Sequence, residues 1–381
     1  MNKFLTKYLN RPPRLHKSVI LILCSLFFTS CGSLPVEDKL VRLWVRSSEV
    51  TDYTGENLNL PFQPVLYKNK IISANSVDGL MAFDKVFGHK IWNLQIEGGL
   101  SSPGLLVSDF LFFTGYDGFA YSVSAQDGKI LWKKSINYPS LQSLFYESGR
   151  VYILTNNSEV LALEASSGEQ VWSFSKKNQR KISVGGIGNF LSLGSLLITG
   201  LSNGDLIALE KSNGKVRWQR RLNFNSRFRD LKTLILFDTD KLLVAGYDDH
   251  IYNIDVVSGA LKWKRKFSVV TNFLNVTKDE ICFGTADSEI KCVNPTIGAE
   301  TKNFKIPSIA GQITKINDQT LLFGLSKGGV QILNLTNSKT INYETFAGVT
   351  NAPIWNEKKL EVYFNSNAGN VYVLKLDKVY K

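Results

Sequence analysis

Side chains that could carry out chemistry are few in this chain of 381 residues. Beyond residue 30 only two histidines occur, His89 and His250, which are far apart and stand in or beside expected turns. A zinc site needs three or four such ligands close together, so we expect neither histidine to bind a metal. The sequence also lacks the HExxH, phosphate-loop and dinucleotide-binding motifs. We therefore predict no catalytic residue, no metal and no cofactor.

Four aspartates are the remaining candidates for acid–base chemistry. They occupy expected turns at equivalent places of successive repeats and are Asp117, Asp248, Asp249 and Asp287. An aspartate in a turn commonly accepts hydrogen bonds from its own backbone. We therefore interpret these residues as structural.

Two of the four cysteines could form a disulfide. Cys282 and Cys292 lie in ICFGTADSEIKC, which is typical of two short strands around a turn. In an oxidising compartment they could pair across this hairpin, if the strand register brings them face to face. Two buried free thiols are the alternative.

The first thirty residues differ from the rest of the chain. Residues 1–17 carry five basic side chains and no acidic one, and the short apolar run SVILILCSLFFTS follows. This run is too short to span a bilayer, which favours an export signal over a membrane helix. Small residues precede Cys31 in FFTSCGS, and this resembles the bacterial lipoprotein box, in which the cysteine is acylated. We predict a signal peptide over 1–30 and a lipidated tether over 31–39; cleavage near Ser30 without lipidation is the alternative. By the same resemblance, Gly32 after the cysteine suggests sorting to the outer membrane.

Without residues 1–30 the chain has 40 basic and 33 acidic side chains, a formal net charge of +7. The basic residues are spread over many expected turns, without the interleaved aromatic residues of a nucleic-acid groove. We therefore predict no nucleic-acid partner.

A repeated hairpin organises the chain from residue 40 onwards. Each copy has an alternating apolar strand, a turn that ends in glycine, and a tryptophan four residues after that glycine, as in DGLMAFDKVFGHKIW and NGDLIALEKSNGKVRW. The turn glycines are Gly88, Gly128, Gly168, Gly214 and Gly259, and the tryptophans are Trp92, Trp132, Trp172, Trp218 and Trp263. Steps of 40, 40, 46 and 45 residues between these glycines indicate β-propeller blades, which must stack on their neighbours. We expect each tryptophan to pack on the adjacent blade.

The number of copies predicts the number of blades. Three weaker copies follow, with Lys302 and Asn342 at tryptophan positions and Ser338 at a glycine position, and the last copy has no closing strand. The segment LVRLWVRSS, which begins at Leu40, has the alternation and the tryptophan of a closing strand but no partner strands before it. We therefore predict an all-β fold over 40–381: an eight-bladed β-propeller of four-stranded blades, with the N-terminal strand closing the last blade.

Two of the repeats are longer than the others by about five residues each. The extra residues fall in KKNQRKIS, residues 176–183, and NFNSRFRD, residues 223–230, both between a closing strand and the next blade. Connections of this class emerge on one face of a propeller, so the two insertions should form one basic prominence. Surface loops on a rigid scaffold often carry function; drift in loop length is the alternative.

The repeats resemble the quinoprotein-type (PQQ-like) pattern DG.LYALDA.TGK..W. Together with the lipoprotein signal, the tether GSLPVED and a single eight-bladed ring, they are similar to the BamB family, the lipoproteins of the outer-membrane β-barrel assembly machinery. The resemblance implies a non-catalytic scaffold, lipid-anchored at the periplasmic face of the outer membrane. Its implied partners are the periplasmic POTRA domains of the central barrel protein and unfolded outer-membrane proteins. Cofactor-binding quinoproteins carry a vicinal cysteine pair, which this sequence lacks.

The resemblance also implies partner-binding residues in the two insertions. Arg180 matches the family's arginine, Asp230 its first acid, and Lys177 and Gln179 its apolar positions, whereas Lys232 stands where the second acid is expected. With the other basic residues of the second insertion, the predicted partner-binding set is Lys177, Gln179, Arg180, Arg227, Arg229 and Asp230. Two alternatives remain: a quinoprotein-like dehydrogenase, and a ligand-binding propeller of the envelope unrelated to barrel assembly.

Overall fold

The computed structural model describes residues 36–46, 62–75, 79–176, 188–223 and 228–380. All the regular elements described are β-strands. Within these ranges no helix is long and apolar enough to cross a membrane. Two compact units divide the chain, Met1–Asp38 with Lys378–Lys381, and Lys39–Asp377, which contains the propeller.

The strands form eight sheets of four strands, here called blades 1 to 8. Blade 1 contains β2 (Val65–Tyr67), β3 (Lys70–Asn75), β4 (Gly79–Asp84) and β5 (Lys90–Leu94); blade 2 contains β6 (Leu105–Val107), β7 (Phe110–Thr114), β8 (Phe119–Ser124) and β9 (Ile130–Ser135). Blade 3 contains β10 (Phe145–Glu147), β11 (Arg150–Leu154), β12 (Glu159–Glu164) and β13 (Gln170–Ser175); blade 4 contains β14 (Leu191–Leu193), β15 (Leu196–Gly200), β16 (Asp205–Glu210) and β17 (Val216–Arg221). Blade 5 contains β18 (Leu231–Asp238), β19 (Lys241–Gly246), β20 (His250–Asp255) and β21 (Leu261–Lys266); blade 6 contains β22 (Leu274–Thr277), β23 (Glu280–Thr285), β24 (Glu289–Val293) and β25 (Glu300–Lys305). Blade 7 contains β26 (Ala310–Asn317), β27 (Thr320–Leu325), β28 (Val330–Asn334) and β29 (Thr340–Tyr343); blade 8 contains β30 (Ile354–Asn356), β31 (Glu361–Asn365), β32 (Val371–Tyr380) and β1 (Val36–Arg46).

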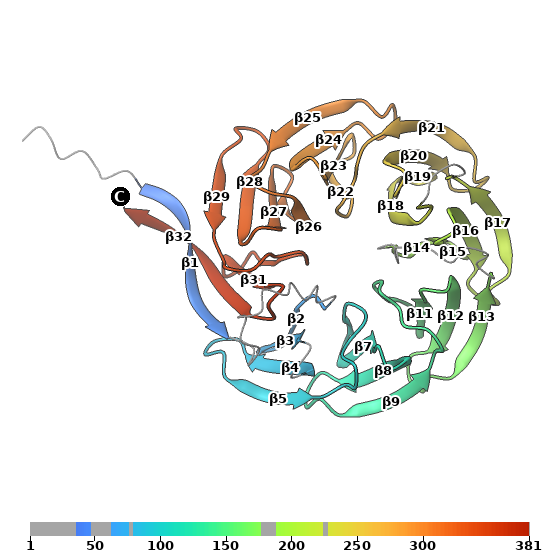
Figure 1. Cartoon of the computed structure of the whole chain (residues 1–381), viewed down its shortest axis with the longest axis horizontal. Helices are drawn as coiled ribbons and strands as arrows, with labels where there is room; N and C mark the ends of the chain where they lie inside the picture. The colour runs from blue at the N-terminus through green and yellow to red at the C-terminus, as the bar shows by residue number, and fades with distance from the viewer. Residues whose placement is uncertain (1–35, 47–61, 76–78, 177–187, 224–227, 381) are drawn as a thin grey trace, which may run out of the picture. The chain divides into compact units, whose positions relative to one another are not determined.

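The predicted closure of the ring is confirmed. The strand order β1-β32-β31-β30 places the N-terminal strand at the outer edge of blade 8, where Figure 1 shows it beside β32. An apolar cluster then joins blade 8 to blade 1 and includes Trp44, Ile71, Phe83 and Tyr363. The first and last parts of the propeller are therefore held together by one core and by one shared sheet.

The core consists of apolar layers between the blades. Eight clusters of buried residues occur, one at each of the eight interfaces between neighbouring blades. The second and third strands of each blade are buried almost throughout, whereas the outermost strands alternate between half-buried and exposed positions. This explains why the middle strands have nearly continuous apolar sequences: each has a neighbouring blade on both faces.

Contacts between a tryptophan and a glycine occur at six of the eight interfaces between blades. The turn glycines adopt positive φ, between 69° and 77°, and a Cβ at any of them would lie within 2.5 to 3.1 Å of the tryptophan ring of the preceding blade. The pairs are Trp44 with Gly88, Trp92 with Gly128, Trp132 with Gly168, Trp172 with Gly214, Trp218 with Gly259, and Trp263 with Gly298. In five of the pairs the indole N–H also donates to a carbonyl of the same turn, at 2.8 to 3.2 Å. Each predicted tryptophan therefore packs on the next blade, as expected.

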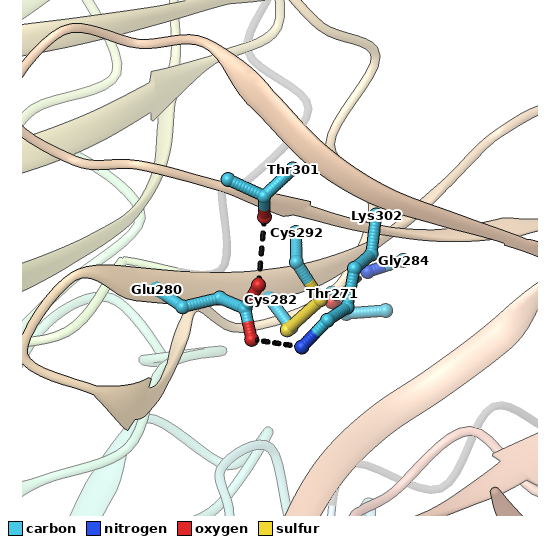
Figure 2. Close-up of a disulfide and its surroundings, with 7 residues drawn as sticks. All are labelled: Thr271, Glu280, Cys282, Gly284, Cys292, Thr301 and Lys302. Atoms are coloured by element: carbon cyan, nitrogen blue, oxygen red, sulfur yellow. Dashed lines mark hydrogen bonds and ion pairs between the residues drawn. A yellow bond between two sulfur atoms is a disulfide. The ribbon is translucent and has the colours of Figure 1, made fainter. Parts of the chain in front are cut away.

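Blades 6 and 7 depart from this pattern together. Lys302 occupies the tryptophan position of blade 6, and its ammonium pairs with Glu280 of the same blade at 2.7 Å (Figure 2). Opposite it, blade 7 has Ser338 at the glycine position, with φ 60°. Because no indole ring packs on this turn, the residue at position 338 still adopts positive φ, but there is room for a side chain.

A disulfide joins Cys282 and Cys292 in this same blade. The two cysteines are direct partners across β23 and β24, with Cα atoms 4.0 Å apart, and both are fully buried (Figure 2). Of the two alternatives left open by the sequence, the structure has the bridge. It links the two middle strands of a blade that lacks the outer tryptophan.

We predict that Gly214→Ala destabilises the propeller more than Gly149→Ala does. Both glycines have positive φ, where alanine costs about 1–2 kcal/mol. A Cβ at Gly214 would lie 2.5 Å from the Trp172 ring, whereas one at Gly149 meets nothing within 4 Å. Overpacking should therefore add about 1–3 kcal/mol at Gly214 alone. Urea unfolding measures both free energies; equal losses would show that the indole contact adds nothing to the backbone strain.

Candidate functional site

The two predicted insertions connect blade 3 to blade 4 and blade 4 to blade 5. Much of both lies outside the described residues, namely 177–187 and 224–227. Of the predicted site residues, Cys31, Lys177, Gln179, Arg180 and Arg227 fall in undescribed parts of the chain. The structure describes where each insertion leaves and rejoins the ring, and these attachment points are the candidate site.

A buried carboxylate joins the attachment points of the two insertions. Asp205, the first residue of β16, is fully buried, and it accepts hydrogen bonds from Lys176 Nζ at 2.7 Å and from Arg221 Nε at 2.8 Å. Lys176 is the first residue of the first insertion, and Arg221 is the last residue of β17, just before the second. One side chain of blade 4 therefore fixes the start of both insertions.

Electrostatics strengthen this junction. Burial by itself raises the pKa of Asp205, but the hydrogen bonds from Arg221 and Lys176 outweigh that effect and hold the pKa below the usual value of the carboxyl group. The side chains of Lys176 and Arg221 are only about one-third exposed, at 31% and 38%. Asn203 donates a further hydrogen bond to the same carboxylate at 2.7 Å. Asp205 is therefore ionised at neutral pH, and its charge is shared by two cations.

Short-range contacts hold the two ends of the second insertion together. Asn223 Nδ2 donates to the carbonyl of Phe228 at 3.0 Å, across the undescribed residues. Gly204, with φ +86°, lies against the backbone of Asn223 and Arg229, where a Cβ would come within 2.9 Å of a carbonyl oxygen. The two ends of this insertion are thus pinned together against the turn that precedes Asp205.

Asp230 does not have the exposed loop position expected from the sequence. Its side chain is fully buried, and its carbonyl accepts a hydrogen bond from Tyr247 N at 3.0 Å. The reason is that Leu231, the next residue, packs directly on Gly200 of blade 4, which draws the end of the insertion into the interface. Of the two described residues in the predicted partner-binding set, only Arg229 is partly exposed.

The turn aspartates have mainly structural contacts. Asp117 accepts from Phe119 N of its own turn at 3.3 Å and also bonds the hydroxyl of Tyr121, which confirms the expected role. Asp248 instead bonds the hydroxyl of Tyr252 at 2.5 Å and an ammonium from the outer strand, that of Lys264, at 3.3 Å. In both blades the aspartate ties its turn to the tyrosine four residues later.

One group of possible metal ligands occurs among the residues that the structure describes: Glu280, Cys282 and Cys292. Both sulfur atoms are bonded to each other, and the Glu280 carboxylate already accepts from Thr301 and Lys302 at 2.7 Å each (Figure 2). Because the thiolates that would bind a soft metal are consumed by the disulfide, this group serves the fold of blade 6.

The sequence analysis missed Asp205 and Arg221 as site residues. Asp205 lies two residues after Asn203, which occupies the turn position that Asp117 has in blade 2, so Asp205 falls outside the pattern of turn aspartates. Asp205 and Arg221 are direct cross-strand partners of β16 and β17. The sequence signal for this pair is an acidic and a basic residue at opposing positions of one predicted hairpin.

Comparisons with known proteins agree with this architecture. The model of the family described as outer membrane protein assembly factor BamB matches residues 77–304, more than half of the chain. An outer membrane protein assembly factor BamB from Shewanella oneidensis is 21% identical over 241 residues, which cover 58% of this chain and 60% of that protein. The match thus spans less than two thirds of this relative.

Two solved structures share the fold. The crystal structure of BamB from Moraxella catarrhalis superposes with a TM-score of 0.73 at 18% identity, covering 88% of this chain and 99% of that one. A quinohemoprotein alcohol dehydrogenase from Pseudomonas putida superposes with a TM-score of 0.69 at 12% identity, covering 90% of this chain and 77% of that one. At these identities the likeness concerns the fold alone, and an enzyme and an assembly factor share it.

We predict that Asp205→Asn lowers the free energy of unfolding by about 1–3 kcal/mol at pH 7. The estimate lies below the cost of breaking a fully buried pair because both cations are partly exposed. The folded-state pKa is depressed, so the stabilisation is present above the unfolded-state pKa and is lost as the pH falls through the folded-state value. The difference between the two proteins should therefore shrink below about pH 4 in urea unfolding experiments.

The matched control is Asp127→Asn, which removes an exposed carboxylate paired with Lys129. We expect it to leave stability unchanged within error. Limited trypsin digestion gives a second measurement. Loss of the contact between Lys176 and Asp205 should speed cleavage in the first insertion of Asp205→Asn, and Asp127→Asn should be cleaved as the unmodified chain is. Unchanged stability and unchanged cleavage in Asp205→Asn would show that the carboxylate does not organise the insertions.

Proposed function

Because this chain belongs to the family of outer membrane protein assembly factor BamB, we propose that it is a non-catalytic scaffold of outer-membrane protein assembly. In this proposal it docks on the periplasmic POTRA region of the central barrel protein through the two insertions flanking blade 4. It thereby aids the folding and insertion of outer-membrane proteins, and unfolded members of that class are further partners.

The observation that carries the proposal is that both insertions are anchored at Asp205. Lys176 and Arg221 both bind this carboxylate, so the two insertions begin side by side on one edge of a rigid ring. Pre-organised loops lose less conformational freedom when they bind, which raises affinity without new contacts. Two neighbouring loops fixed at a common point are suited to docking one protein surface.

Charge indicates what kind of surface the partner offers. The first insertion contains Lys176, Lys177, Arg180 and Lys181, and the second contains Arg227 and Arg229 against the single acid Asp230, which is buried. The two insertions therefore carry a net positive charge. An acidic patch on the partner would be complementary and would speed association.

A quinoprotein-like activity receives less support. Its cofactor-binding members carry adjacent cysteines, whereas Cys282 and Cys292 are ten residues apart and bridge two strands. The fold is common to both classes, and function resides in sites rather than in folds.

We further propose that residues 1–30 are a signal peptide and that Cys31, on a tether over residues 31–39, carries the lipid that holds the propeller of residues 40–381 at the periplasmic face of the outer membrane. The support is the sequence of the N-terminal segment and the family to which the chain belongs.

For the docking surface, we predict that Arg180→Glu combined with Arg227→Glu weakens binding to the periplasmic domains of the barrel protein by about tenfold or more. Reversed charges facing an acidic patch replace attraction with repulsion, which can cost several kcal/mol. Biolayer interferometry with the immobilised POTRA region measures the affinity. Thermal melts should stay unchanged if the two residues lie on the surface as proposed, because surface substitutions usually shift stability by about 0.5 kcal/mol or less.

The control for this pair is Lys358→Glu with Lys359→Glu, which makes the same change of charge. Both lysines are exposed on the turn between β30 and β31 of blade 8, and that class of turn lies on the opposite face of a propeller from the insertions. Equal affinities for the two double variants would place the interface elsewhere on the ring.

For the lipid anchor, we predict that Cys31→Ala yields a folded protein that no longer sediments with membranes. Each buried methylene of an acyl chain contributes about 0.8 kcal/mol to membrane attachment, and this variant has no acyl chain. Fractionation in cells that lack the barrel partner isolates the anchor from protein–protein attachment. Continued sedimentation of the variant with outer membranes in those cells would contradict lipidation at Cys31.

A further inference from the structure

Blades 3 to 7 border a cavity of about 370 Å³. Its wall is formed by residues of β18, by the segment that connects blade 5 to blade 6, and by the start of β26, with Asn189 of blade 4 and Ser143, just before β10 of blade 3, at one side. Cavities of about 300–1,000 Å³ are typical of small-molecule sites. The docking proposal assigns no role to this space.

Lys232 is the single charged residue among the described residues that line the cavity. Its ammonium donates to the carbonyl of Val269 at 2.6 Å and lies 4.3 Å from the centre of the Tyr247 ring. Burial lowers the pKa of Lys232, an effect that Asp249 and Asp248 oppose from a distance. Within the described part of the chain Lys232 takes part in no salt bridge. An ammonium has three N–H donors, and the carbonyl satisfies one of them.

The neighbouring amides show which polar groups remain available. Asn189 bonds both backbone groups of Leu234, and Asn272 bonds both backbone groups of Ile313, so these two side chains serve as bridges between blades. Gln312 uses its carbonyl oxygen to accept from Asn272 N at 2.9 Å. Its Nε2 donors have no partner among the described residues. Lys232 and Gln312 therefore both have N–H donors that no described residue uses.

The rest of the wall is apolar. Leu234 and Phe273 are buried, Val270 is half-buried, and all three line the same space. A ligand that matched both parts would carry a small anionic group at one end and a hydrocarbon group at the other. A carboxylate suits the polar end, because it only accepts hydrogen bonds and pairs strongly with an ammonium.

We propose that this cavity binds a small carboxylate with an apolar substituent, whose oxygens accept hydrogen bonds from Lys232 and Gln312 and whose hydrocarbon part packs on Leu234, Val270 and Phe273. Two sources share this chemistry: a free aliphatic acid, and the terminal carboxylate of an apolar amino acid or peptide. The inference extends beyond the docking function and does not depend on it.

The test is calorimetric titration of the whole mature chain with hexanoate, N-acetylleucine and the neutral analogue hexanamide. We expect saturable binding of at least one carboxylate, and binding of the amide weaker by about tenfold or more, because a hydrogen bond to a charged group is lost. The tighter of the two carboxylates identifies the source. Lys232→Met and Gln312→Leu should each weaken carboxylate binding.

The matched control is Lys264→Met, because Lys264 also lies over a tyrosine ring, that of Tyr252 at 5.0 Å, but stands on the exposed outer strand β21. It should bind as the unmodified chain does. The comparison of acid with amide uses the unmodified chain, so it holds even if Lys232→Met fails to fold. Absence of saturable binding, equal affinity for acid and amide, or carboxylate binding that survives both Lys232→Met and Gln312→Leu would overturn the proposal.

Discussion

The contact between a tryptophan ring and the turn glycine of the following blade is the interaction on which the rest of the ring depends. A four-stranded blade cannot bury both of its faces alone, so its stability comes from its neighbours. The contact constrains both partners. The glycine must adopt positive φ and leave space for the ring, and in five of the six pairs the indole also donates its N–H to a carbonyl of the same turn. Repetition of this pair around blades 8, 1, 2, 3, 4, 5 and 6 sets the spacing of the sequence and the register of the outer strands.

The remaining interfaces show what replaces the contact. At blade 6 the outer position is a lysine that pairs within its own blade, and a disulfide links the two middle strands. Between blades 6 and 7, Asn272 bonds both backbone groups of Ile313. Between blades 7 and 8, Gly324 allows Val349 to approach so closely that any side chain there would collide. Blade 8 has no turn before its outer strand, because that strand comes from the N-terminus, and so no turn glycine is needed there.

A ring held in this way can place variable loops at fixed points. Asp205 fixes the start of two insertions at blade 4, and the second insertion ends at buried Asp230, two residues before Lys232 at the cavity. The proposed docking surface and the proposed carboxylate site are thus separate: the first consists of the two basic insertions, and the second is a cavity bordered by blades 3 to 7. They share blades 4 and 5, where the repeat lengthens, and both use a charge that the scaffold holds in a defined place.

The sequence by itself determined the repeated hairpin, the eight blades, the closing role of the strand around Trp44 and the family. These follow from local patterns, because strand alternation, turn glycines and regularly spaced tryptophans are written within each repeat. Tertiary structure alone decided which residues meet across repeats. It placed Asp205 between Lys176 and Arg221, buried Asp230 by packing Leu231 on Gly200, and turned Lys232 into a cavity instead of outwards. It also decided the Cys282–Cys292 bridge, which requires the two residues to be direct cross-strand partners. Such outcomes depend on distances between segments tens of residues apart, which no local pattern encodes.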